Sequence, residues 1–141
     1  MARVHIDLPA HLPFSTELAV RITDINYGGH LGNDSLVSLL HEARARMLRH
    51  HGFSEMELGG AGIIIADAAI SYRAEAFFAD RLRVEIGGQD FSRVGGDLVY
   101  RVSNVEDGRE VARAKTGIVF FDYGRRKVRA APPEFRQLFE P

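Results

Sequence analysis

One amphipathic helix pattern, in a chain otherwise patterned for strands, is the feature that most constrains this fold. Residues 34–51 place apolar side chains at three- and four-residue spacing, as in a helix with one buried face. Strand-like patterns occupy residues 14–22, 63–75, 81–91, 97–105 and 110–121. Because one helix cannot cover both faces of such a sheet, the economical solution wraps a curved antiparallel sheet of about five strands around it. We predict an α+β fold in which the four later strands follow in meander order.

The same patterns predict details of the elements. The apolar stripe of the helix should contain Leu36, Leu40, Ala43 and Met47, widened by Val37 and Leu39. Ile22 is expected on the buried face of the first strand. Gly95-Gly96 is a hairpin signal, and residues 54–58 suit one short helical turn. The free edges and second face of the sheet need a cover, and we expect a second subunit to supply it.

Composition bounds the class of protein. The 141 residues suit a single domain, 1–141, with an irregular leader over residues 1–13. The formal net charge is −1 and basic residues do not gather on one helix, which argues against nucleic acid as the main partner. The chain has no cysteine, which fits a reducing cytoplasm and excludes thiolate metal sites. It has neither a signal-peptide layout nor an apolar run that could span a membrane, so we expect a cytoplasmic protein without a membrane partner.

A polar, glycine-rich stretch at residues 23–34 joins the first strand to the helix. A strand that ends in such a turn and opens a helix leaves free backbone N–H groups, which can hold a carbonyl oxygen or an anion. The stretch also carries the polar side chains of Asp24, Asn26, His30, Asn33 and Asp34. In the simpler alternative, Gly28 and Gly29 make the turn, Asn33 or Asp34 caps the helix, and His30 is a surface residue.

The layout and this stretch resemble the hotdog fold, and in particular its 4-hydroxybenzoyl-CoA thioesterase-like branch. That branch reads D-x-D-x-x-G-H-V-N-N, followed by an apolar helix containing E-A-R. The matching residues here are Asp24, Gly29-His30, Asn33 and Glu42-Ala43-Arg44. The resemblance continues at Ala79-Asp80, Ala112, Ala114 and Pro133-Glu134. It implies a thioester hydrolase, specifically an acyl-CoA thioesterase, that acts as a homodimer or homotetramer.

The resemblance also implies the chemistry of the site. The substrate would be an acyl-CoA or acyl-carrier thioester, with no cofactor beyond the coenzyme A of the substrate and no metal. Backbone N–H groups of the 28–32 turn would polarise the thioester carbonyl. The catalytic set would be Asp24, Asn26, His30 and Asn33. The substrate-binding set would be Tyr27, Gly28, Gly29, Gly32, Asp34, Glu42, Arg73 and Arg93, with the two arginines meeting phosphates.

One position departs from the family pattern. Where many catalytic members have the second Asp of D-x-D, this chain has Asn26, and an amide cannot take a proton from water. A replacement base must come from Asp24, Asp34 or Glu42, and we rank Asp24 first because it shares the loop and strand side with Asn26. The alternatives are that Asp24 stabilises the turn, Asp34 caps the helix and Glu42 pairs with Arg46.

Two other functions remain open. A hotdog acyl-CoA hydratase would use an Asp and His pair spaced as D-x-N-P-x-H. Here Tyr27 replaces the proline and His30 lies one residue too far along. A non-catalytic protein that binds an acyl or aromatic ligand is the reading that Asn26 itself suggests.

Overall fold

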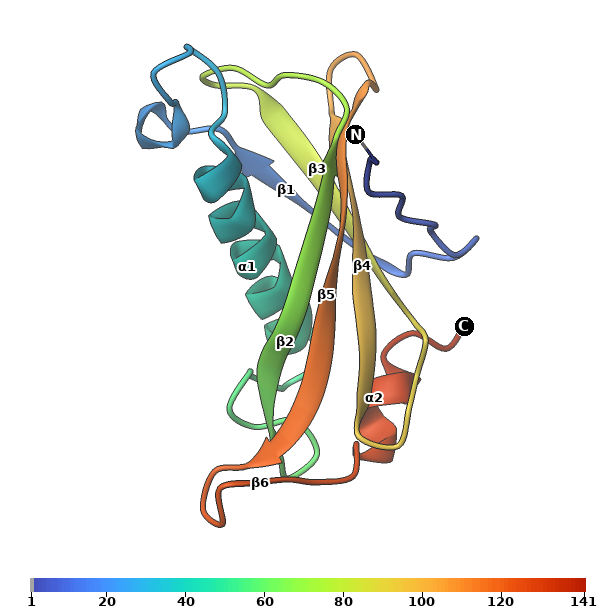
Figure 1. Ribbon diagram of the computed structural model, residues 1–141. Helices are drawn as coiled ribbons and strands as arrows, with labels where there is room; N and C mark the ends of the chain where they lie inside the picture. The colour runs from blue at the N-terminus through green and yellow to red at the C-terminus, as the bar shows by residue number, and fades with distance from the viewer. Residues whose placement is uncertain (1) are drawn as a thin grey trace.

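The computed structural model describes residues 2–141 and consists of one antiparallel sheet with a long helix against one face (Figure 1). The strands are β1 (Phe14–Ala19), β2 (Gly62–Tyr72), β3 (Arg81–Gln89), β4 (Gly95–Asn104), β5 (Glu110–Asp122) and β6 (Lys127–Val128). The helices are the short 3-10 helix η1 (Ile22–Asp24), the long α1 (Asn33–His50) and the short α2 (Pro133–Gln137). The α+β class and the long helix are as predicted.

The strand order differs from the predicted meander. The sheet runs β1-β3-β4-β5-β2, with β6 paired to β5. Only β3, β4 and β5 form a meander, whereas β2 pairs with β5 at the far edge. Residues 73–80 carry the chain from β2 back across the end of the sheet to β3 (Figure 1). Periodicity identifies strands but not their partners, which is why the order was wrong.

Helix α1 packs its apolar face on the concave side of the sheet. Its buried residues are Leu36, Leu39, Leu40, Ala43, Arg44, Met47 and Leu48. Val37 is half exposed, so its predicted place in the stripe was wrong. Ile22 is also exposed, because β1 ends at Ala19 and the chain turns into η1. Opposite the helix, Ala112 and Ala114 on β5 are small, which lets a helix lie close to the sheet.

Two short segments differ from the predictions. Residues 54–58 form no helical turn. Gly95 and Gly96 belong to β4, and the hairpin loop is residues 90–94. Gly95 is required there because a Cβ would overlap the carbonyl oxygen of Ile118 on β5. The glycine pair therefore marks a place where β4 lies close to β5, and it does not form the turn itself.

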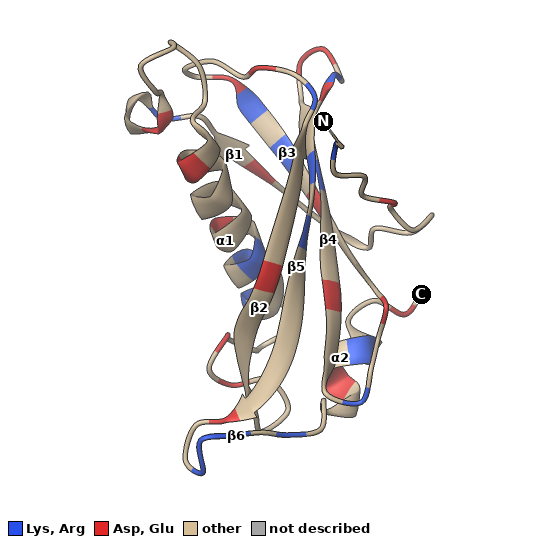
Figure 2. Cartoon of the chain, viewed as in Figure 1, with Lys and Arg blue, Asp and Glu red and all other residues tan. Residues whose placement is uncertain are grey.

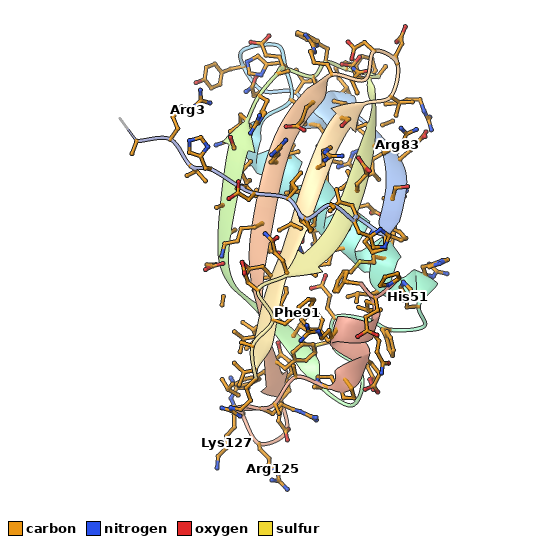
Figure 3. All side chains as sticks on the ribbon, turned by 90° about the vertical axis from the view of Figure 1, so that its right-hand side faces the viewer. Arg3, His51, Arg83, Phe91, Arg125 and Lys127 are labelled. Atoms are coloured by element: carbon orange, nitrogen blue, oxygen red, sulfur yellow. The ribbon has the colours of Figure 1, made fainter. Side chains whose placement is uncertain are left out.

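The leader, residues 2–13, crosses the outer face of the sheet (Figure 3). Met1, the first residue of the predicted leader, lies outside the described residues. The side chain of Gln89 donates to the Asp7 carbonyl at 2.8 Å, and Arg113 donates to the Ile6 carbonyl at 3.4 Å. Ile6 is buried, and so is Val99, which pairs with Gly87 on β3. This irregular segment therefore covers part of the face for which we expected a second subunit.

Candidate functional site

A cavity of about 780 Å³ opens at the start of α1. The polar turn contributes Asn26, Tyr27, His30 and Leu31, and the helix contributes Asn33, Asp34 and Leu36. The end of β2 and the segment after it contribute Tyr72, Arg73, Ala74, Glu75 and Ala76, and β5 contributes Val111. The turn, the first turn of the helix and the end of β2 thus meet around one volume.

Asn26 organises the turn through its side-chain oxygen. Its Oδ1 accepts the backbone N–H of Gly28 at 2.9 Å and that of His30 at 3.4 Å. The Asn26 backbone carbonyl accepts the Gly29 N–H at 3.1 Å, and the Asn26 N–H donates to the His30 carbonyl at 2.9 Å. Asn26 is therefore a turn-forming residue that also lines the cavity.

The backbone N–H groups of residues 28–32 are already used inside the protein. Gly28, Gly29 and His30 donate to Asn26, as described above. Leu31 donates to the Ala76 carbonyl at 2.8 Å, and Gly32 donates to the Asp24 carbonyl at 2.9 Å. The expectation that this turn offers N–H groups to a thioester carbonyl is therefore wrong. These N–H groups already donate to acceptors within the protein and thereby close the loop.

The first turn of α1 supplies donors instead. Gly32 is the N-cap, and neither Asn33 nor Asp34 caps the helix as expected, because both lie inside it. The Asp34 N–H donates to the Asn33 side chain at 2.9 Å. Within the described residues, the N–H groups of Asn33 and Ser35 have no hydrogen-bond acceptor. Such unpaired N–H groups at the positive end of a helix suit a carbonyl oxygen or an anion.

Asp24 is buried against Arg21 rather than turned into the cavity. Its carboxylate accepts from the Arg21 backbone N–H at 2.8 Å and from the guanidinium at 3.1 and 3.2 Å. Burial opposes ionisation of Asp24, but the hydrogen bonds from the Arg21 side chain and backbone prevail and hold its pKa below the ordinary value. The position of Asp24 fits the alternative stated for it, in which its side chain stabilises the turn.

The carboxylates that line the cavity are Asp34 and Glu75. Burial, together with the negative charge of Asp34, raises the pKa of Tyr72, so its hydroxyl stays protonated at neutral pH.

His30 places Nδ1 3.3 Å from the Leu31 carbonyl and Nε2 3.9 Å from the Glu75 carboxylate. If Nδ1 carries the proton, Nε2 is a proton acceptor facing Glu75.

Five predicted substrate-binding residues do not line this cavity: the turn residues Gly28, Gly29 and Gly32, and the more distant Glu42 and Arg93. Glu42 pairs with Arg46 at 2.8 Å on the exposed side of α1, which is the alternative stated for it. Arg93 lines a separate hollow with Phe91 and Pro132, and Figure 3 shows Phe91 at the opposite end of the sheet from Arg3. Arg73 does line the cavity. Among the described residues, no group of three His, Cys, Asp or Glu side chains could hold a metal ion.

Sequence reasoning missed Tyr72 and Glu75. Both come from the end of β2 and the segment that follows, about forty residues after the turn that they face. The Leu31 to Ala76 backbone hydrogen bond brings this segment to the turn. No local motif marks these positions, because their role depends on the pairing of β2 with β5.

The chain belongs to the thioesterase-like superfamily, whose family model matches residues 20–139. The acyl-CoA thioester hydrolase YbgC of Escherichia coli O6:H1 is 31% identical to it over 132 residues, which span 88% of this chain and 96% of that protein. The resemblance found in the sequence is thus confirmed. None of the helices among residues 2–141 is both long and apolar enough to cross a membrane.

Solved structures agree on the fold. A 1,4-dihydroxy-2-naphthoyl-CoA thioesterase from Synechocystis has a TM-score of 0.79 and 24% identity over 89% of this chain and 93% of that chain. A DHNA-CoA thioesterase from Staphylococcus aureus has a TM-score of 0.73 and 20% identity over 82% and 78% of the two chains. At these identities the likeness concerns the fold alone, and the predicted hotdog fold is confirmed.

Proposed function

We propose that this protein hydrolyses acyl-CoA thioesters in the cavity at the start of α1. One observation carries the proposal. The same cavity is lined by the first turn of α1, whose Asn33 N–H has no acceptor among residues 2–141, and by Asp34. An N–H at a helix start can stabilise the negative charge that develops on a thioester oxygen, and a nearby carboxylate can take a proton from water.

The reaction then follows from these groups. The thioester carbonyl oxygen accepts a hydrogen bond from the Asn33 N–H, and the helix dipole favours the oxyanion. Asp34 takes a proton from water as the water oxygen attacks the carbonyl carbon. The carbon–sulfur bond breaks, and the proton held by Asp34 passes to the departing thiolate. The products are a carboxylic acid and free coenzyme A, and Asp34 ends ionised as it began.

Asp34 replaces Asp24 as our preferred base. Asp24 is held by three hydrogen bonds from Arg21 and is absent from the cavity lining, whereas Asp34 lines it. Glu75, also in the lining, is the next candidate. The hydratase alternative loses support for the same reason, because its Asp and His pair would need Asp24 beside His30. The non-catalytic alternative becomes an outcome of the test below.

Thiol release from a panel of acyl-CoA substrates tests the proposal. The native protein should release thiol, and Asp34→Asn should lower kcat by about a hundred- to ten-thousand-fold. Glu42→Gln is the matched control on the same helix, since its carboxylate pairs with Arg46 outside the cavity. Full activity in Asp34→Asn with loss in Glu75→Gln would move the base to Glu75. Saturable acyl-CoA binding without thiol release would favour the binding-protein function.

We also propose a cytoplasmic homo-oligomer. β2 lies at an edge of the sheet, and its residues 65–68 are exposed. Next to it, Ile65 and Val37 expose apolar surface. A second copy could pair along this edge and cover both. Light scattering at micromolar concentration should give a dimer or tetramer, and a monomer there would contradict the assembly. The cysteine-free sequence supports the cytoplasm as the location.

A further inference from the structure

A second cavity adjoins the first across the end of β2. It measures about 350 Å³ and is lined by Arg3, Val4, His5, Ser71, Tyr72 and Arg73. Tyr72 and Arg73 line both cavities, so the two hollows share a wall. The leader supplies the other side. A ligand at the helix start could therefore extend along the end of β2 towards the leader.

The leader is held in place where it forms this wall. Arg3 donates to the Tyr72 carbonyl at 3.3 Å, and the Ile6 carbonyl accepts from Arg113 at 3.4 Å. Ile6, three residues after Arg3, is buried on the outer face of the sheet. Figure 3 shows the leader crossing that face and Arg3 beyond its edge. Arg3 is therefore held at the end of β2 by one hydrogen bond, and the leader is held three residues later at Ile6.

The charges around this second cavity favour an anion. Its lining contains two arginines and a histidine, and no carboxylate. Among the described residues, no carboxylate lies within ion-pair distance of Arg3. Arg73 contacts Glu110 at 3.3 Å, but Glu110 also contacts Arg113 at 2.8 Å and Arg101 at 3.5 Å. Arg101 is also paired with Glu85 at 3.5 Å, so two carboxylates serve three guanidinium groups and one positive charge remains. Figure 2 shows one basic residue on the leader near the N-terminus, and further basic residues at the adjoining strand ends.

We propose that Arg3, His5 and Arg73 form a subsite for the phosphates of the 3′,5′-ADP part of coenzyme A. This inference rests on the proposed function, because the acyl end of the substrate would lie at the start of α1. The pantetheine arm would pass Tyr72, which lines both cavities. Guanidinium groups bind phosphate by charge-assisted and bidentate hydrogen bonds. The subsite thus distinguishes free acyl-CoA from a thioester that lacks the nucleotide.

Direct binding of 3′,5′-ADP tests the subsite without requiring catalysis. Calorimetry on the native oligomer should detect binding, and Arg3→Ala should weaken it about tenfold. Arg125→Ala is the matched control, because it removes the same charge from the turn between β5 and β6, far from Arg3 in Figure 3. Equal weakening by the control would indicate a general charge effect and overturn the subsite.

Kinetics with two thioesters of the same acyl group complete the test. Arg3→Ala and Arg73→Gln should each raise KM for acyl-CoA about tenfold relative to KM for acyl-pantetheine, which has no phosphate. If native protein hydrolyses both thioesters with equal KM and does not bind 3′,5′-ADP, the subsite is wrong and the proposed function stands. If neither is hydrolysed but 3′,5′-ADP binds in an Arg3-dependent manner, the proposed function fails and the subsite stands.

Discussion

The side-chain oxygen of Asn26 accepts the backbone N–H of Gly28 at 2.9 Å, so the residue at the family's usual carboxylate position holds its own turn together. An aspartate is isosteric with asparagine and could accept the same hydrogen bonds from Gly28 and His30. Its second oxygen would then take the place of the amide nitrogen of Asn26, a residue that lines the cavity. Position 26 can therefore gain or lose a carboxylate without losing the hydrogen bonds that form the turn.

The first prediction concerns Asn26→Asp. The variant should keep the melting temperature and gain a carboxylate in the cavity, held ionised by two backbone N–H groups. We expect kcat to rise at least about tenfold, since a positioned general base typically contributes more than that. Thiol release over a range of pH is the measurement. Asn26→Ala, which loses the turn hydrogen bonds, should lower the melting temperature. A drop in kcat for Asn26→Asp would contradict this prediction. It would show that the new carboxylate interferes with the base already present, which we propose to be Asp34.

The second prediction separates the Asp34 carboxylate from the geometry of the turn. Gly32 has φ −72° and ψ 152°, which alanine adopts freely, but a Cβ there would lie 2.6 Å from the Asp34 Oδ1. Gly32→Ala should therefore turn Asp34 away and lower kcat at least about tenfold with little loss of stability.

Gly29→Ala is its counterpart. Gly29 has φ +84° and open space around a Cβ, so this variant strains the backbone by about 1 kcal/mol without touching Asp34. It should lower the melting temperature and keep most of kcat. Full activity in Gly32→Ala would argue against Asp34 as the base.

The third prediction concerns stability at acid pH. The folded protein holds the pKa of Asp24 low, so its stabilising effect is complete above the ordinary carboxyl pKa of about 3.9 and is lost as the pH falls below it. Asp24→Asn should cost about 1–2 kcal/mol at pH 7 and show a shallower loss of stability from pH 5 downwards. Its kcat should fall much less than that of Asp34→Asn.

Arg21→Gln provides the complementary measurement. It leaves Asp24 buried without its guanidinium partner, so the pKa of Asp24 should rise and acid unfolding should begin at a higher pH. Urea unfolding at several pH values follows both variants. An unchanged pH profile in both would show that this ion pair does not govern acid stability.

The fourth prediction concerns the buried network beneath α1. Arg44 donates to the Tyr100 hydroxyl at 3.1 Å, and that hydroxyl lies 2.7 Å from the Thr116 hydroxyl. Burial raises the pKa of Tyr100, so the hydroxyl stays protonated and able to donate. Tyr100→Phe should destabilise the protein by about 1–3 kcal/mol, because buried partners lose their hydrogen bonds.

Chemical denaturation measures that cost. Tyr123→Phe is the control, since its hydroxyl donates to the Ile63 carbonyl at 3.1 Å on a side chain that is 39% exposed. The control should cost less, and neither variant should change kcat. A larger loss in the control would contradict the structural role assigned to the Arg44 network.

The sequence by itself determined the fold class, the long helix, the position of most strands and the family. These follow from periodicity and from local motifs, in which the informative residues are neighbours along the chain. The turn at 23–34 and the E-A-R motif of the helix belong to this group. Hydrophobic spacing also predicted the buried Leu36, Leu40, Ala43 and Met47 correctly.

Tertiary structure decided which residues share the site. Asp24 and Asp34 have the same side chain and lie in the same stretch, but η1 turns Asp24 towards Arg21, and the first turn of α1 places Asp34 in the cavity. Tyr72 and Glu75 reach that cavity because β2 pairs with β5 at the sheet edge. Spacing in sequence records local periodicity, whereas strand pairing joins residues at long separation. The composition of the site was therefore fixed only by the folded chain.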